Sequence, residues 1–102
     1  MNIKTAKVGS NLIISLNGEL DESVADFTRK NIDKFILSER FENVIFDMNG
    51  LSFMDSTGIG VLLGRYKLIK KLGGVAMIKG SNKQIDRVLT MSGIYTIMEK
   101  IS

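Results

Sequence analysis

The sequence contains no histidine and no cysteine among its 102 residues. A Ser-His-Asp triad, a Cys-His pair and an ordinary zinc site each need an imidazole or a thiolate near neutral pH. Most hydrolase chemistry is therefore excluded. Asp47 and Asp55 would in principle suit an acid–base pair or a pair of magnesium ligands. They are the only acidic residues between positions 43 and 85, so a structural role is favoured. We expect a binding protein, not an enzyme, with no cofactor and no metal.

Long apolar runs are also missing. The longest, Ile59–Leu63, is interrupted by Gly60 and is far shorter than the roughly 20 residues of a membrane span. Met1–Lys7 alternates polar and apolar residues and lacks the apolar centre of a secretory signal. We therefore expect a cytoplasmic protein that does not contact a membrane.

The length and composition are those of one compact domain. Hydrophobic residues make up 44% and charged residues 25% of the chain, which are ordinary globular values. We therefore expect residues 1–102 to form a single domain. The net charge of +3 comes mainly from scattered lysines. The arginines are far apart and are not interleaved with exposed aromatics, so no nucleic-acid partner is expected.

The first half of the chain predicts a hairpin, a helix and a central strand. Ile3–Val8 and Leu12–Leu16 are strand-like and are joined by turn residues. The segment 21–38 has apolar residues at helical spacing and begins at Asp21 or a neighbour, which would cap it. Val44–Phe46 is a short apolar run typical of a strand covered on both faces, ending at 47–50.

The second half of the chain continues the alternation of strands and helices. A helix is predicted over 56–72, a strand over 75–79, and a short helix opened by a Ser81–Gln84 capping box and closed by Gly93. Residues 94–98 are predicted as a last short strand. Together these patterns predict an α/β fold with a mostly parallel sheet of four or five strands, an N-terminal antiparallel hairpin and helices packed on the sheet.

Ser56 is the strongest candidate for a functional residue. Leu51–Asp55 is predicted to be the loop that leaves the central strand, which places Ser56 at the start of the next helix. Open α/β sheets bind their ligands at this end of their strands. Asp55, Ser56 or Thr57 would also serve simply to cap the helix, so the pattern alone leaves both explanations open.

Glycines in the same helix indicate a second feature. Gly58, Gly60 and Gly64 each cost the helix about 1 kcal/mol relative to alanine, so a compensating contact is expected. Gly60, Gly64 and Leu68 are spaced by four residues and, together with Val61, line a side of the helix with small or apolar side chains. This stripe lies away from the apolar face that carries Ile59, Leu62 and Leu63. Either another helix of the same domain packs there, or a partner protein does.

The run Leu51–Lys67 (LSFMDSTGIGVLLGRYK) resembles the signature of bacterial anti-sigma factor antagonists, the single-domain members of the STAS group. Further similarity lies in Gly18–Asp21 and Met91–Gly93, and the resemblance extends over nearly the whole chain. The sporulation members of the family are the most similar, and the general-stress members are near relatives.

This resemblance implies a mechanism. In the family, the serine after the motif aspartate, here Ser56, is phosphorylated by an anti-sigma factor that is itself an ATP-dependent serine kinase. The unmodified antagonist binds that kinase and frees the sigma factor. Phosphorylation ends this binding, and a serine phosphatase that removes the phosphate restores it. The implied partner surface comprises Asp21, Asp55, Ser56, Thr57, Gly58, Gly60, Val61, Gly64 and Leu68.

Other hypotheses remain open at this point. The same surface would suit a STAS subunit of a lipid-transport or stress-signalling complex that docks without phosphorylation, and the strand-end loop alone would suit a small-ligand sensor. Family members commonly continue into another helix after the last strand, whereas this sequence stops at Ser102. We therefore expect that helix to be absent or trimmed.

Overall fold

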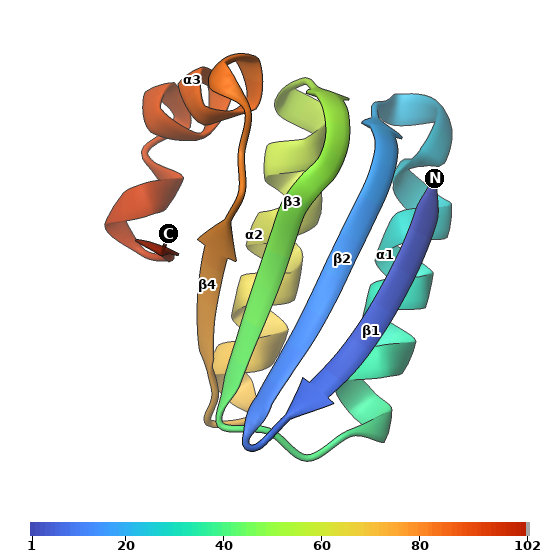
Figure 1. The fold of residues 1–102 in the computed structure, drawn as a ribbon, viewed down its shortest axis with the longest axis vertical. Helices are drawn as coiled ribbons and strands as arrows, with labels where there is room; N and C mark the ends of the chain where they lie inside the picture. Colours follow the sequence, from blue (N-terminus) through green and yellow to red (C-terminus); the bar gives the residue numbers. More distant parts are fainter. Residues whose placement is uncertain (102) are drawn as a thin grey trace.

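The computed structural model describes residues 1–101, which form one α/β unit with a five-stranded sheet. The elements within this range are β1 (Asn2–Val8), β2 (Asn11–Leu20), α1 (Glu22–Ser38), β3 (Asn43–Met54), α2 (Ser56–Lys71), β4 (Val75–Lys79), α3 (Lys83–Ser92), the 3₁₀-helix η1 (Ile94–Thr96) and β5 (Glu99–Ile101). The strands lie in chain order, as Figure 1 shows for the first four. β1 is antiparallel to β2, and the other neighbours are parallel, which confirms the predicted fold class.

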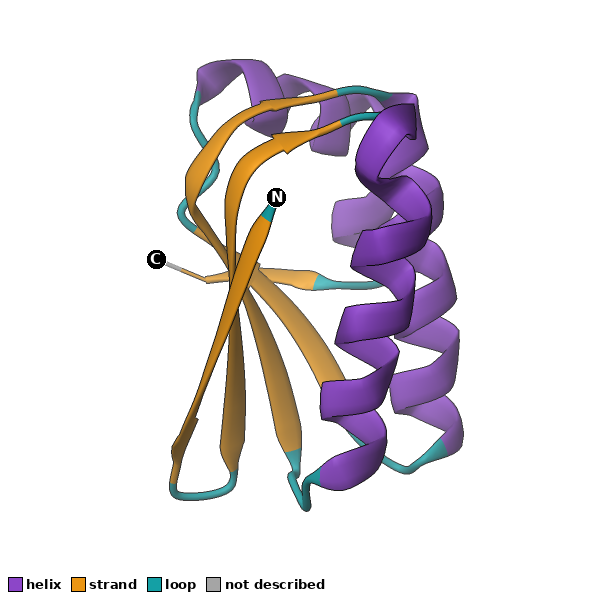
Figure 2. Cartoon of the chain, turned by 90° about the vertical axis from the view of Figure 1, so that its right-hand side faces the viewer, coloured by secondary structure: helices purple, strands orange, loops and turns teal. Residues whose placement is uncertain are grey.

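The long helices α1 and α2 cover only one face of the sheet (Figure 2). The prediction that Val44–Phe46 is covered on both faces is therefore wrong. Val44 and Phe46 are fully buried beneath the helices, whereas Ile45 points to the other face and is 9% exposed. Ile13 and Met77 flank it in register on the neighbouring strands, and such apolar cross-strand neighbours shield one another without a covering helix.

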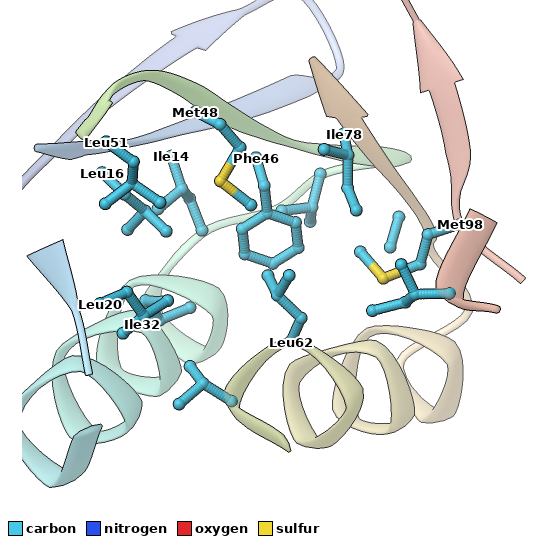
Figure 3. Close-up of a cluster of buried hydrophobic side chains, with 14 of the residues drawn as sticks. Ile14, Leu16, Leu20, Ile32, Phe46, Met48, Leu51, Leu62, Ile78 and Met98 are labelled. Carbon is cyan, nitrogen blue, oxygen red and sulfur yellow. The ribbon is translucent and has the colours of Figure 1, made fainter. Parts of the chain in front are cut away.

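The core fills the space between the sheet and these two helices (Figure 3). Phe46 on β3 is fully buried and lies opposite Leu62 of α2, while Ile32 brings α1 into the same cluster. Met98 closes the cluster beyond β4. Burial of a large apolar side chain contributes roughly 1.5–3 kcal/mol, so this cluster holds both helices in place against the sheet.

β3 is longer than the sequence indicates. The segment Leu51–Asp55 was expected to be a loop, but Leu51–Met54 continues the strand. Two register irregularities allow the second half of β3 to follow β2, so that Gly18 pairs with Leu51 and Leu20 with Met54. Backbone pairing with β2 therefore keeps residues 47–54 extended, although Asp47, Asn49 and Gly50 interrupt the apolar pattern that would mark them as a strand.

The first turn of α3 differs from the predicted capping box. Asn82 caps the helix, with its Oδ1 accepting a hydrogen bond from the Ile85 amide at 2.9 Å. Ser81 lies outside the helix, and its hydroxyl is 3.3 Å from the Tyr95 hydroxyl. Gln84 reaches back to β3 instead of to the cap. Asparagine is as good an N-cap as serine, so both assignments fit the sequence and the tertiary contacts decide between them.

The end of the described chain also differs from the expectation of a strand over 94–98. Gly93 ends α3 in a left-handed conformation, as predicted, with φ of 79°. The following amides bond locally, Thr96 to Gly93 and Ile97 to Ile94, each at 3.0 Å. These local bonds form η1, and the strand β5 begins only at Glu99.

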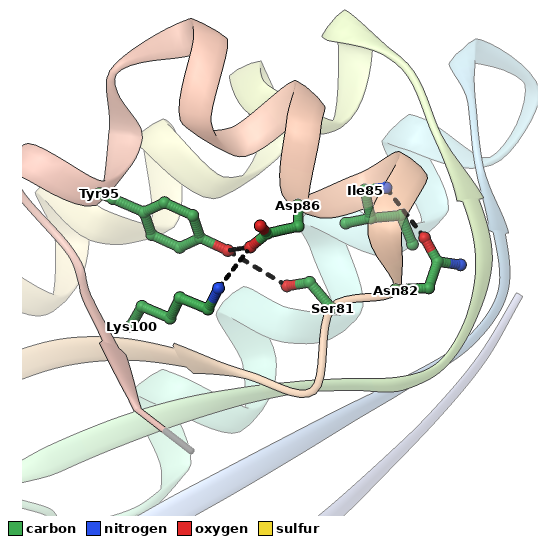
Figure 4. Close-up of polar contacts among 6 residues, drawn as sticks. All are labelled: Ser81, Asn82, Ile85, Asp86, Tyr95 and Lys100. Atoms are coloured by element: carbon green, nitrogen blue, oxygen red, sulfur yellow. Dashed lines mark hydrogen bonds and ion pairs between the residues drawn. The ribbon is translucent and has the colours of Figure 1, made fainter.

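A polar cluster fastens this segment to α3 (Figure 4). The Tyr95 hydroxyl donates to Asp86 Oδ1 at 2.7 Å, and Lys100 Nζ lies 2.9 Å from the same oxygen. The hydrogen bond from Lys100, followed by the one from Tyr95, holds the pKa of Asp86 below its ordinary value. Burial raises the pKa of Tyr95 to about 12, so its hydroxyl remains a donor at neutral pH.

Removing this hydroxyl is expected to weaken the fold in a pH-dependent way. Tyr95→Phe should lower the free energy of unfolding by about 1 kcal/mol at pH 7, measured by urea denaturation. Because the folded pKa of Asp86 is lowered, its contribution is complete above the ordinary aspartate pKa of about 4 and is lost as the pH falls through the folded value. The deficit of the variant should therefore shrink below about pH 4.

Tyr66→Phe is the matched control, since the Tyr66 hydroxyl lies 3.5 Å from Lys70 Nζ in an exposed position. Its stability should equal that of the wild type. A Tyr95→Phe deficit that stays constant down to pH 2.5 (roughly one unit and a half below the aspartate value) would contradict a role for the ionised Asp86.

Candidate partner-binding site

Two strand ends and two helix starts meet at one end of the sheet. Leu20 and Met54 are paired in register at the ends of β2 and β3, and the Asp55 amide donates to the Leu20 carbonyl at 3.4 Å. Both strands curve over here toward the helices that follow them (Figure 2). Asp21 therefore lies at the same end of the sheet as Ser56.

Each of these aspartates caps the helix that it precedes. Asp21 Oδ1 accepts from the Ser23 amide at 3.0 Å and from the Ser23 hydroxyl at 2.6 Å, and this hydroxyl is the main cause of a lowered Asp21 pKa. Asp55 Oδ1 accepts from the Thr57 amide at 2.9 Å. Both carboxylates thus have a structural role, which is compatible with a contact to a partner and does not require one.

Ser56 is the first residue of α2 and its side chain is exposed. Its place in the first turn of α2, at the positive end of the helix dipole, suits an added anion. Thr57 is half-buried and faces a hollow of about 440 Å³ between the two helices, lined also by Glu22, Ala25, Asp26 and Arg29. Of the two neighbouring hydroxyls, Ser56 is therefore the more accessible.

The glycines of α2 divide into two kinds. Gly58 is buried, and a Cβ there would collide with Cγ and Sδ of Met54 and lie 3.2 Å from Cδ2 of Leu20. A Cβ on Gly60 or Gly64 would meet no atom of residues 1–101 within 4 Å apart from its chain neighbours and the nearby backbone of α2 itself. The explanation that another helix of this domain packs against Gly60 and Gly64 is therefore wrong for the described part of the chain.

The predicted stripe is narrower than the sequence indicated. Val61 is fully buried and belongs to the core, because its place on the helix faces α1 and the sheet. Leu68 is half-buried and packs against the core with one side. Gly60 and Gly64, bordered by Leu68, remain as the surface part of the stripe, on the helix that begins with Ser56.

Three residues at this end of the sheet were not predicted to belong to the site. Phe53 is 38% exposed, two residues before Asp55. Asn82 and Gln84 on α3 bond to the backbone of β3. Only the glutamine drew attention in the sequence, as half of a capping box. Its true contacts join residues about 30 positions apart, which no local pattern reveals.

Two other kinds of site are absent from residues 1–101. Within residues 1–101, no group of three or more acidic side chains is arranged to hold a metal ion. No helix in the described part of the chain has both the length and the hydropathy to cross a membrane. The candidate partner-binding site is the end of the sheet around Ser56, together with the side of α2 that carries Gly60 and Gly64.

The profile of the STAS domain matches residues 2–102. The chain belongs to the STAS family. An anti-sigma F factor antagonist of Paenibacillus polymyxa is 42% identical to this STAS protein over 87 residues, which cover 85% of the present chain and 74% of that protein.

Two solved structures extend the similarity to three dimensions. The unphosphorylated form of the anti-sigma factor antagonist SpoIIAA has a TM-score of 0.81 at 26% identity, with 99% of this chain and 89% of that chain covered. The phosphorylated form of the Bacillus cell fate determinant SpoIIAA has a TM-score of 0.72 at 26% identity, with 99% and 92% covered. These relatives are regulatory binding proteins and not enzymes, so the predicted family and its non-enzymatic class are confirmed.

Proposed function

We propose that this STAS protein is an anti-sigma factor antagonist controlled by phosphorylation of Ser56. The unmodified protein binds an anti-sigma factor serine kinase and frees the sigma factor. Phosphorylation of Ser56 ends the complex, and a serine phosphatase restores binding. The observation that carries the proposal is the exposed hydroxyl of Ser56, at the start of α2 directly after Asp55, in a chain similar to an anti-sigma F factor antagonist.

The proposed contact surface is the end of the sheet together with one side of α2. Asp21, Asp55, Ser56 and Thr57 form its centre, and Gly60, Gly64 and Leu68 extend it along the helix. Gly58 and Val61 support it from below, since both are buried. We place this activity in the cytoplasm, in a sporulation pathway, and assign it to residues 1–102 acting as one STAS domain.

The chemistry of the site favours a switch that acts on binding more than on folding. A phosphate on Ser56 adds a charge of about −1.5 to −2. The helix amides beside it tolerate this charge in water, so the domain should stay folded. In a complex the same charge must be desolvated next to Asp55, and an acidic partner group would repel it.

The direct test is to incubate the protein with ATP and the anti-sigma factor serine kinase of the same organism, and to locate phosphate by mass spectrometry. We expect one phosphate on Ser56, none in Ser56→Ala, and normal incorporation in Thr57→Ala. Phosphate on another residue, or incorporation that persists in Ser56→Ala, would overturn the proposal.

The glycine stripe has its own prediction. In the unphosphorylated protein, Gly64→Arg should lower the affinity for the kinase about tenfold, a change of roughly 1.4 kcal/mol. The reason is that the long side chain occupies the open space where the partner packs. The fold should be unharmed, since arginine forms helices better than glycine. Affinity is measured by calorimetry and stability by urea denaturation.

Lys71→Ala is the control, at the far end of the same helix, and should bind like the wild type. Equal affinities for Gly64→Arg and the wild type would show that the stripe lies outside the interface.

A further inference from the structure

The last part of β3 lacks a strand neighbour on one side. Pairing with β4 ends at Asp47 and Lys79, whereas pairing with β2 continues to Leu20 and Met54. Among the residues that the structure describes, no strand therefore pairs with 48–54 on the β4 side. Unpaired backbone groups at a sheet edge need other partners when they are shielded from water.

Side chains of α3 supply those partners. Asn82 Nδ2 donates to the carbonyl oxygens of Leu51 and Ser52, each at 3.3 Å. Gln84 Nε2 donates to the Met54 carbonyl at 2.9 Å, and Gln84 Oε1 accepts from the Met54 amide at 3.3 Å. The amide of Gln84 thus pairs with both backbone groups of one residue, as a neighbouring strand would.

Met54 is also held through its side chain. It is fully buried, and Gly58 of α2 packs against it so closely that a Cβ on this glycine would lie 2.6 Å from its Sδ. The next residue is Asp55, the cap of α2, and the one after it is Ser56. The bonds from Gln84 therefore fix the backbone just two residues before the proposed phosphorylation site.

α3 is itself well anchored, so it is able to act as a support. Ile85 and Leu89 are fully buried, and Asp86 is bonded to Tyr95 and Lys100 (Figure 4). The side chains of Asn82 and Gln84 at the start of this helix are therefore anchored well enough to hold β3 in position.

We propose that Gln84, assisted by Asn82, is a positioning residue for the phosphorylation switch. The two side chains take the place of a missing strand along β3, and they fix the direction in which Asp55 and Ser56 enter α2. Their effect on phosphorylation rests on the proposed function of Ser56, whereas their effect on the backbone does not.

The test compares Gln84→Met, which keeps the length of the side chain and removes both hydrogen bonds, with Lys83→Met at the neighbouring exposed position of the same turn. Amide hydrogen exchange of Asp55–Gly58 should become roughly five- to tenfold faster in Gln84→Met, the effect of losing about one hydrogen bond. Exchange in the core strands and the urea midpoint should change little. Gln84→Glu, which still accepts from the Met54 amide but lacks the donor, should fall between.

The kinetics of phosphorylation by the anti-sigma factor serine kinase give the second readout. Gln84→Met should lower kcat roughly fivefold while KM changes by less than about twofold, because a misdirected hydroxyl impairs transfer more than docking. Lys83→Met should match the wild type in both readouts.

Two results would overturn the proposal. One is wild-type exchange at Asp55–Gly58 in Gln84→Met, and the other is a uniform rise in exchange throughout the protein, which would indicate a general loss of stability. If the wild type accepts no phosphate at all, the proposed function fails, while the exchange experiment still decides the role of Gln84.

Discussion

The protein phosphorylated on Ser56 is expected to bind the anti-sigma factor kinase about a thousandfold more weakly than the unmodified protein, a difference of roughly 4 kcal/mol. The penalty arises because a dianion at the exposed start of α2 would lose its hydration in the interface while lying next to the Asp55 carboxylate. Calorimetry without ATP measures the two affinities directly.

The free protein should be changed much less by the same phosphate. The α2 amides and the helix dipole favour a negative charge at this position. The free energy of unfolding of the phosphorylated protein, measured by urea denaturation, should therefore differ from that of the unmodified protein by no more than an ordinary surface change, about 0.5 kcal/mol. A loss of binding that is matched by a loss of folding would contradict a switch that acts on the interface.

Ser38 offers a matched control for charge alone. It ends α1, and Figure 1 shows that α1 runs from the Ser56 end of the sheet to the opposite end. Ser38→Asp should leave the affinity unchanged, whereas Ser56→Asp should weaken it, though less than a phosphate because one carboxylate carries about half the charge. Equal weakening by both substitutions would mean that total charge decides binding and that Ser56 has no special place.

Gly58→Ala is expected to lower the free energy of unfolding by about 2 kcal/mol, although alanine normally stabilises a helix. The new methyl group would collide with Met54 and approach Leu20, and both of these side chains are fully buried. A packed core yields to an added methyl group only by shifting side chains or backbone. Urea denaturation with an unchanged m-value would measure this loss.

Gly60→Ala is the control, because it adds the same methyl group to the same helix where no described atom lies within 4 Å. It should raise stability by up to about 1 kcal/mol. If both variants are stabilised, Met54 is able to move aside, and the close packing between Gly58 and β3 is not what fixes the start of α2.

Local patterns were sufficient for several elements. The ranges predicted for α1, α2 and β4 lie within one residue of those observed, because apolar periodicity, capping aspartates and glycine stops act over a few residues. The antiparallel hairpin was predicted for the same reason, from the turn residues that follow Val8. Expectations that depended on distant contacts were less successful. The length of β3 depends on pairing with β2, and the cap of α3 depends on where Ser81 and Gln84 find their other partners.

The sequence by itself determined the family, the mostly parallel sheet and the place of Ser56 at the start of a helix, whereas the structure identified Asp55 as the cap of that helix. It also excluded a histidine-assisted nucleophile, since the chain has no histidine. Only the tertiary structure separated Gly60 and Gly64, which border open space, from the buried Gly58 and Val61. The reason is physical: the spacing of residues states which ones share a side of a helix, whereas burial depends on which other elements pack there.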